Sequence, residues 1–311
     1  MSHGSPYLKT SYPGDSALAG TAFLRTWLAV FGAAALAFPL VATPLLIDLA
    51  CRTAIAVVGA HALHLLTGYT GLVSLGHAGL IAAGAFTSAI LVEELKAPFG
   101  VAFGCSIVVG ALLGLVVGIP SLRLKGLYLA LSTLALHFVI LYLVGEYQSG
   151  RGFATGLLVP RPAVGAFTLS GATAWYYALL GAAALTTLFC VNLVRTRPGR
   201  AWMAIRDRDI AAATTGVNVT YYKLLAFVVS SALTAFCGSL WAYYNGFVSV
   251  EAFSFFMTIE YIAMIIIGGM GSILGSILGA FFVTVLPYAV DAAINALPVP
   301  ARLQTHLFAV K

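Results

Sequence analysis

Repeated apolar runs of about 20 residues, each bounded by charged, glycine or proline residues, dominate this chain of 311 residues. A run of that length is what an α-helix needs to cross the hydrocarbon core of a bilayer. Charged residues make up only 8% of the chain and hydrophobic residues 61%, a balance that excludes an ordinary soluble domain. The runs lack the alternation of transmembrane β-strands. The sequence therefore predicts an all-α, polytopic transmembrane helical bundle.

The boundaries of the apolar runs predict nine membrane spans. A polar segment at residues 1–25 precedes the first run, which begins too late and is too long for a cleaved signal peptide. We therefore expect residues 1–25 to be a cytoplasmic tail and residues 26–300 to form one transmembrane domain. The expected spans are 27–47, 49–67, 72–92, 99–119, 126–145, 174–194, 224–245, 259–277 and 278–297.

The distribution of charge predicts how these spans are oriented. With the N-terminus in the cytoplasm, the inner segments hold ten of the sixteen basic residues and three of the ten acidic ones. This is the bias that the positive-inside rule describes. The basic character of the chain is thus an orientation signal, and we expect no nucleic-acid partner. The junction at 68–71 carries no charge that would place it.

The segment 195–223 is the one long, strongly polar stretch between two apolar runs. Pro198 ends the preceding span, and residues 201–213 are rich in helix formers. Gly216 suits the left-handed residue after a helix, while Asn218 or Thr220 can cap the next one. The sequence predicts a short surface helix between two spans, of the kind that a cytoplasmic protein can bind.

Two glycine-rich stretches interrupt the apolar runs. Residues 68–79 combine a helix break with the polar side chains Tyr69, Thr70, Ser74 and His77. Irregular backbone at membrane depth is found where it is buried in protein or lines a wet cavity, so one interpretation is a translocation pathway. The other is an ordinary cytoplasmic turn. Residues 268–272 predict a tight reversal between the last two spans. Glycines every fourth residue, at 110, 114 and 118 and at 271, 275 and 279, predict close helix packing.

No pattern in the sequence predicts catalysis. The P-loop pattern, GxSxG and HExxH are absent, and no pair of carboxylates shares one face of a span. His61 and His64 share a helix face without a third ligand, so we expect no metal site and no cofactor in this chain. The four cysteines stand alone in apolar runs. No acidic residue clearly lies at the midplane of a span, which argues against one alternative function, an ion- or proton-coupled secondary transporter.

Four stretches resemble the permease subunits of the branched-chain amino acid family of bacterial ABC importers, in the longer of its two paired permease types. They are GYTGLVSLGHAGL at 68–80, RLKGLYLALSTLAL at 123–136, GRAWMAIRDRDIAAATTGVNVTYYKLLAFVVSSAL at 199–233 and FVSVEAFSFFMTIEYIAMIIIGGMGSILGSILGA at 247–280. The resemblance implies a non-enzymatic transport subunit of the bacterial cytoplasmic (inner) membrane. Its expected partners are a second permease, two cytoplasmic ATPases that hold ATP and Mg, a periplasmic or lipid-anchored substrate-binding protein, and membrane lipids.

The resemblance also assigns residues to three roles. Ile210 stands where the importer coupling motif has Glu. The residues expected to couple to the ATPases are Gly199, Arg200, Ala204, Ile205, Arg206, Asp207, Ile210, Ala211, Ala212 and Gly216. Those expected along the translocation pathway are Gly68, Tyr69, Gly71, Ser74, Gly76, His77, Glu260, Gly268, Gly269 and Gly271. Those expected to contact the binding protein, in or near the long outer loop at 146–173, are Gln148, Arg151, Arg161 and Glu251.

Two departures from the family pattern bear on function. Ser149-Gly150-Arg151-Gly152 stands where the family usually shows a TGG-type sequence, which leaves the substrate open among amino acids, urea and small aromatic acids. The chain ends at Lys311, where the family continues into another span and a cytoplasmic end. We therefore expect residues 301–311 to begin a further segment of a longer natural chain.

Overall fold

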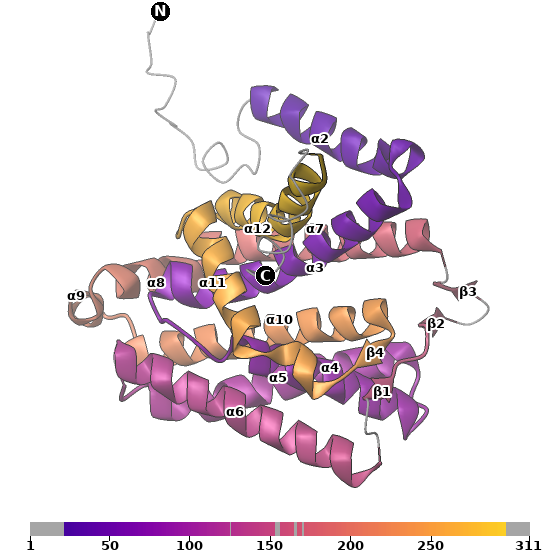
Figure 1. The fold of residues 1–311 in the computed structure, drawn as a ribbon. Helices are drawn as coiled ribbons and strands as arrows, with labels where there is room; N and C mark the ends of the chain where they lie inside the picture. The colour runs from indigo at the N-terminus through magenta and orange to yellow at the C-terminus, as the bar shows by residue number, and fades with distance from the viewer. Residues whose placement is uncertain (1–21, 125, 153–155, 165–166, 170, 297–311) are drawn as a thin grey trace, which may run out of the picture.

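The computed structural model describes residues 22–124, 126–152, 156–164, 167–169 and 171–296, which are mostly helical (Figure 1). The nine apolar helices are α2 (Ala22–Val41), α3 (Pro44–His64), α4 (His77–Glu93), α5 (Phe99–Ser121), α6 (Leu127–Gly150), α7 (Ala172–Arg195), α10 (Val219–Asn245), α11 (Phe255–Gly268) and α12 (Ile273–Ala296). Two short helices, α8 (Arg197–Asp207) and α9 (Asp209–Thr214), lie between α7 and α10, and the π-helix η1 (Leu65–Tyr69) continues α3. Strand β1 (Leu157–Leu158) pairs antiparallel with β4 (Phe247–Val248), β2 (Ala163–Val164) pairs antiparallel with β3 (Phe167–Thr168), and the 3₁₀ helix η2 (Val250–Phe253) follows β4.

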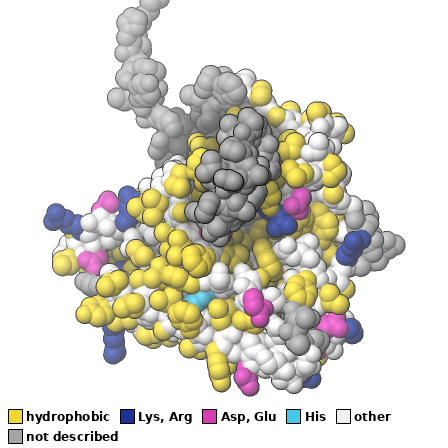
Figure 2. All heavy atoms as spheres, in the orientation of Figure 1, with side chains coloured by type: hydrophobic (Ala, Val, Ile, Leu, Met, Phe, Trp, Pro, Cys, Tyr) yellow, Lys and Arg dark blue, Asp and Glu magenta, His cyan; other side chains and the backbone are white. Residues whose placement is uncertain are grey.

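These helices confirm the predicted all-α polytopic bundle. Six helical stretches in the described residues are long and apolar enough to cross a membrane. Three more expected spans coincide with shorter apolar helices, at Ala29–Val41, His77–Glu93 and Phe255–Gly268. Apolar side chains cover much of the face seen in Figure 2, as expected for a surface that meets lipid or other apolar helices. The full set of nine spans and the cytoplasmic N-terminus remain predictions.

Several predicted boundaries are wrong. The last two helices meet at 269–272, which confirms the reversal predicted at 268–272 but not the span boundary at 277/278, because Gly269 and Gly271 adopt positive φ angles of +98° and +103° and reverse the chain there. The first span ends at Val41 rather than residue 47, since Pro44 begins the next helix, where a proline costs no hydrogen bond. Residues 22–25 belong to α2 rather than to the tail. Residues 1–21 and 301–311 lie outside the described residues.

The predicted single surface helix is also corrected. Arg208 has extended backbone angles (φ −157°, ψ 108°) and separates α8 from α9. The two caps predicted after it are found. Gly216 has φ +87°, and Asn218 Oδ1 accepts a hydrogen bond from Tyr221 N at 3.0 Å at the start of α10. The two short helices therefore form a bent surface element, hereafter the α8–α9 element.

Glycines allow the central helices to pack backbone to backbone. A Cβ at Gly84 in α4 would overlap the backbone of Ala235 in α10, and one at Gly238 would overlap the backbone of Ile81. The predicted ridge at Gly110, Gly114 and Gly118 packs on α10, where added Cβ atoms would press on residues 224–235. The ridge at Gly275 and Gly279 packs on α11. The first predicted ridge and the last two glycines of the second are thus packing surfaces, whereas Gly271 lies in the α11–α12 turn. Helix α10 lies at the centre of the bundle.

The two ends of the bundle differ in structure. In Figure 1 the α8–α9 element lies at one end, on the left, and the four short strands lie at the other, on the right. The pairing of β1 with β4 joins the α6–α7 loop to the segment after α10. These ends correspond to the segments that the charge distribution predicts to be cytoplasmic and external.

Candidate functional site

The α8–α9 element is anchored to α10 through its buried face. Trp202 is completely buried, and its Nε1 donates to the Tyr222 carbonyl oxygen at 2.8 Å. Ile205 is buried one turn further along α8, and Gly199 packs where a Cβ would overlap the Val194 backbone. On α9, Asp209 lies 3.5 Å from Lys223 Nζ. These contacts fix the element while leaving its other face open.

The open face carries an apolar side chain among charged ones. Ile210 is 75% exposed, although it is large and apolar. Ala204 and Ala211 are also exposed, whereas Ala212 is buried. Of the alanines predicted to couple, Ala204 and Ala211 are therefore available to a docking partner, and Ala212 belongs to the anchoring face. Arg200, Arg206 and Asp207 surround them with exposed charge.

Arg206 joins the α8–α9 element to both glycine-rich breaks. Its Nη1 donates to the Gly68 carbonyl oxygen at 2.8 Å, near the end of η1, where helical carbonyls lack intrahelical partners. Arg206 Cγ lies 3.0 Å from the position that a Cβ on Gly71 would take. Arg206 Nη1 lies 3.1 Å from the position that a Cβ on Gly271 would take. His64 Nε2 accepts from Gly271 N at 3.3 Å. One arginine thus contacts the broken helix and the α11–α12 turn together.

The predicted break at 68–79 is real, and most of it is buried. The chain leaves the π-helix at Tyr69 and becomes helical again at His77. Leu75 N donates to Thr133 Oγ1 of α6 at 2.9 Å, and a Cβ at Gly76 would overlap the Thr133 carbonyl. The break therefore combines features of both interpretations, since it is packed inside the protein yet lies beside the α8–α9 element.

The polar side chains of the break point mainly into the core. Tyr69 and Ser74 are buried, and His77 is 2% exposed. The His77 ring packs edge-on against Tyr261 with centroids 4.7 Å apart, and its Nδ1 lies 3.4 Å from Thr234 Oγ1. These contacts match a packing role for His77 in this conformation.

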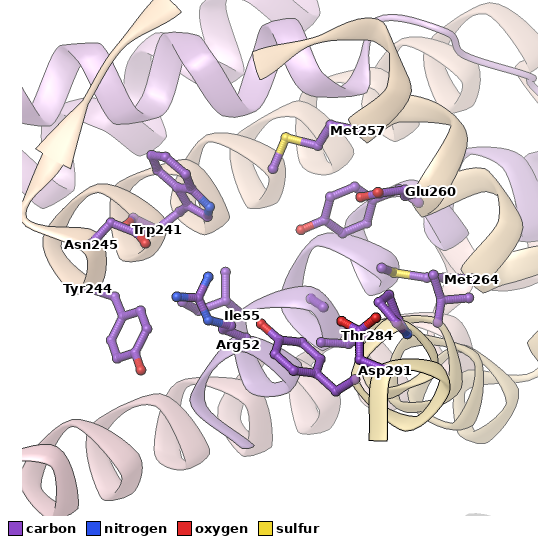
Figure 3. Close-up of a pocket in the computed structure, with 15 residues that line it drawn as sticks. Arg52, Ile55, Trp241, Tyr244, Asn245, Met257, Glu260, Met264, Thr284 and Asp291 are labelled. Carbon is purple, nitrogen blue, oxygen red and sulfur yellow. Dashed lines mark hydrogen bonds between the residues drawn. The ribbon is translucent and has the colours of Figure 1, made fainter. Parts of the chain in front are cut away.

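A cavity of about 540 Å³ opens between α3, α10, α11 and α12 (Figure 3). It is lined by Arg52 from α3, Glu260 from α11 and Asp291 from α12, among apolar and aromatic side chains. Arg52 Nε donates to Asp48 Oδ2 at 2.8 Å, and Tyr244 Oη donates to Asp48 Oδ1. Charged side chains within apolar helices are costly and usually functional. This cavity is the second part of the candidate site.

Of the predicted pathway residues, Glu260 lines the cavity, and Gly268, Gly269 and Gly271 lie at the far end of the same helical hairpin. Arg52 is not among the predicted site residues, because Asp48 falls between the two expected spans 27–47 and 49–67. An Asp–Arg pair spaced i, i+4 is a helical pairing and could have indicated that α3 continues through both residues.

The residues predicted to contact the binding protein lie at the end of the bundle that carries the short strands, and they differ in exposure. Arg161 and Glu251 are exposed, and Arg151 Nε lies 3.5 Å from Glu94 Oε1. Gln148 is 5% exposed, and its Oε1 accepts from Val250 N at 3.2 Å. Gln148 therefore fastens α6 to η2 and offers little surface to a partner.

No group of three His, Cys, Asp or Glu side chains that could hold a metal ion occurs among the described residues. The two neighbouring histidines have separate partners. His61 lies 2.8 Å from Ser276 Oγ and 2.9 Å from Thr187 Oγ1, while His64 faces Gly271. Both histidines tie α3 to neighbouring elements.

The described residues thus form an all-helical bundle of apolar helices, with a bent surface element at one end and a cavity lined by charged side chains between the helices. Residues 45–310 match the model of the family described as "Branched-chain amino acid transport system / permease component", and the chain belongs to that family.

Two similar proteins are high-affinity branched-chain amino acid transport system permease proteins LivM. The one from Salmonella typhimurium is 31% identical over 275 residues, and the one from Escherichia coli is 30% identical over 275 residues. Each comparison covers 81% of this chain, which spans only 65% of the length of the relative. The autoinducer 2 import system permease protein LsrC from Enterobacter sp. is 30% identical over 189 residues, 58% of this chain and 52% of that protein. No solved structure matches the chain.

Proposed function

We propose that this protein is a transmembrane permease subunit of a binding-protein-dependent ABC importer in the bacterial cytoplasmic membrane. With a second permease it forms a pathway for branched-chain or other small amino acids, or related small organic acids. Two cytoplasmic ATPase subunits bind ATP and Mg and drive transport, and a periplasmic or lipid-anchored binding protein delivers the substrate. Family membership and the similarity to LivM proteins support this assignment.

The contact that carries the proposal is the hydrogen bond from Arg206 to Gly68, because it connects an exposed docking face with the interior. A partner that moves the α8–α9 element moves Arg206, which lies against the α11–α12 turn. Helices α11 and α12 line the cavity with Glu260 and Asp291. A rigid helical hairpin can therefore carry movement of the α8–α9 element to the cavity.

The exposed face of the α8–α9 element suits an ATPase surface. Ile210 can fill an apolar groove, and arginines beside it can pair with carboxylates in charge-assisted hydrogen bonds. Buried apolar anchors usually carry most of the binding energy of an interface. We therefore expect Ile210 to dominate the affinity and the surrounding arginines to set the orientation.

Ile210→Asp should separate the permease from its ATPases. The variant places a charge where the proposal puts an apolar contact, so ATPase copurification and uptake should each fall about tenfold or more. Folding should be unaffected, because Ile210 is 75% exposed. Copurification of the tagged permease with the ATPase subunits measures the first quantity, and uptake by proteoliposomes measures the second.

Leu158→Asp is the matched control, since Leu158 is 69% exposed at the opposite end of the bundle. It should leave ATPase copurification at the wild-type level. If Ile210→Asp retained both its ATPases and normal uptake, the α8–α9 element would be a solvated loop and the proposed coupling would be wrong.

A further inference from the structure

The cavity between α3, α10, α11 and α12 carries separated charges of opposite sign. Arg52 Nε donates a hydrogen bond to Asp48. Within the described residues the structure records no hydrogen bond from the two terminal nitrogens of Arg52. The Glu260 carboxylate likewise has no hydrogen-bond or salt-bridge partner in the described part of the chain. Both side chains line the cavity and are exposed. The cavity thus offers a guanidinium donor and a carboxylate acceptor from two different helices.

The guanidinium is held in place before any ligand arrives. Asp48 accepts from Arg52 Nε at 2.8 Å and also from the Tyr244 hydroxyl, so α3 and α10 both fix its position. A planar guanidinium fixed at one edge presents its remaining N–H groups in a defined fork, the geometry that binds a carboxylate at two points. Figure 3 shows Arg52, Glu260 and Asp291 around the same hollow.

Between the charged groups the lining is apolar. Ile55, Trp241, Met257, Met264 and Val283 contribute aliphatic, thioether and indole surface. A cavity of about 540 Å³ lies within the range of small-molecule sites, which combine apolar walls with a few polar groups. Methionines adapt to differently shaped aliphatic groups. The walls therefore suit a compact apolar group more than a sugar, which needs many hydrogen-bond partners.

We propose that this cavity is a transient binding site for a zwitterion with an apolar side chain, in which Arg52 binds the carboxylate and Glu260 the ammonium group. The proposal rests on the proposed function and adds to it the residues that recognise each end of the cargo. Asp291 adds negative charge on the same side as Glu260. The apolar lining of α10 and α11 holds the side chain of the cargo.

The test measures binding of two ligands to the assembled complex without the binding protein. L-leucine carries both charges, and 4-methyl-2-oxopentanoate lacks the ammonium group. Glu260→Gln should weaken leucine binding about tenfold or more, because it replaces a charge-assisted hydrogen bond to the ammonium group by one to a neutral amide, and should leave the oxo acid nearly unchanged. The losses in affinity from removing the ligand's ammonium group and from removing the protein's carboxylate should not be additive, because both changes remove the same interaction.

Glu93→Gln, at a half-buried acid at the end of α4 that pairs with Lys96 and does not line the cavity, is the control and should bind both ligands like the wild type. Met257→Trp, which fills the cavity and keeps its charges, should abolish binding of both ligands. Thermal unfolding of each variant complex checks that it is folded.

Equal weakening of the binding of both ligands by Glu260→Gln, or unchanged leucine binding, overturns the site. So does the absence of saturable leucine binding to the wild type. ATP-driven uptake by the same complex tests the proposed function separately, since it can persist when the site is wrong.

Discussion

Gly238→Leu should prevent this protein from accumulating in folded form. A Cβ at Gly238 would overlap the Ile81 carbonyl group and approach Ala85 N to 3.0 Å, and both belong to the backbone of α4. Backbone cannot move aside as a flexible side chain can, so we expect a penalty at or above the upper end of the ~1–3 kcal/mol typical of overpacked cores. Size-exclusion chromatography and thermal unfolding in detergent measure the result.

Gly104→Leu is the control for this substitution. Gly104 lies inside α5 with nothing within 4 Å of an added Cβ. The same change there should leave the elution profile and melting temperature close to those of the wild type. If Gly238→Leu also eluted and melted like the wild type, the close crossing of α4 and α10 would be wrong.

Arg206→Ala should uncouple ATP hydrolysis from transport while leaving the complex assembled. The variant removes the hydrogen bond to Gly68 and the contact with the α11–α12 turn, but leaves the apolar anchor Ile210 and the neighbouring Arg200 in place. Coupling between distant sites typically changes affinities 5- to 150-fold, and on that scale we expect uptake to fall about tenfold or more. ATPase activity and labelled-substrate uptake of the same proteoliposomes give the coupling ratio.

Arg197→Ala removes another exposed arginine, from the first turn of α8, and should leave the coupling ratio near the wild-type value. Arg206→Lys should retain part of the activity, since lysine keeps the charge but loses the planar fork of donors. Normal uptake by Arg206→Ala would show that the Arg206–Gly68 bond caps a helix end and transmits nothing.

The pattern of apolar runs was sufficient to predict the helices but not all of their ends. Charges and prolines mark most ends, and the helices near 99–121 and 172–195 were placed within a few residues. Between the last two helices the sequence has no charged residue, so the predicted span boundary at 277/278 followed run length, although the reversal predicted at 268–272 is where the chain turns. The positive φ angles of Gly269 and Gly271 are the physical reason for the true position.

The candidate site was predictable only in part, because its key contacts join residues far apart in the chain. Arg206 was expected to meet an ATPase, yet it also caps a helix 138 residues away. No local pattern shows that contact. Glu260 was expected along the pathway, but that it lines the same cavity as Arg52 depends on how α3 packs against α11 and α12. The division at Arg208 was missed because its neighbours favour helix, although Asp209 suits the first turn of a new helix.

A photo-crosslinking amino acid at position 210 of the assembled complex tests the central claim most directly. The claim is that the α8–α9 element faces the cytoplasm and docks on the ATPases. Irradiation should join position 210 to an ATPase subunit, whereas the same probe at position 158, at the strand end, should give no ATPase adduct. ATPase adducts from position 158 and none from position 210 would contradict both the orientation of the bundle and the proposed coupling element.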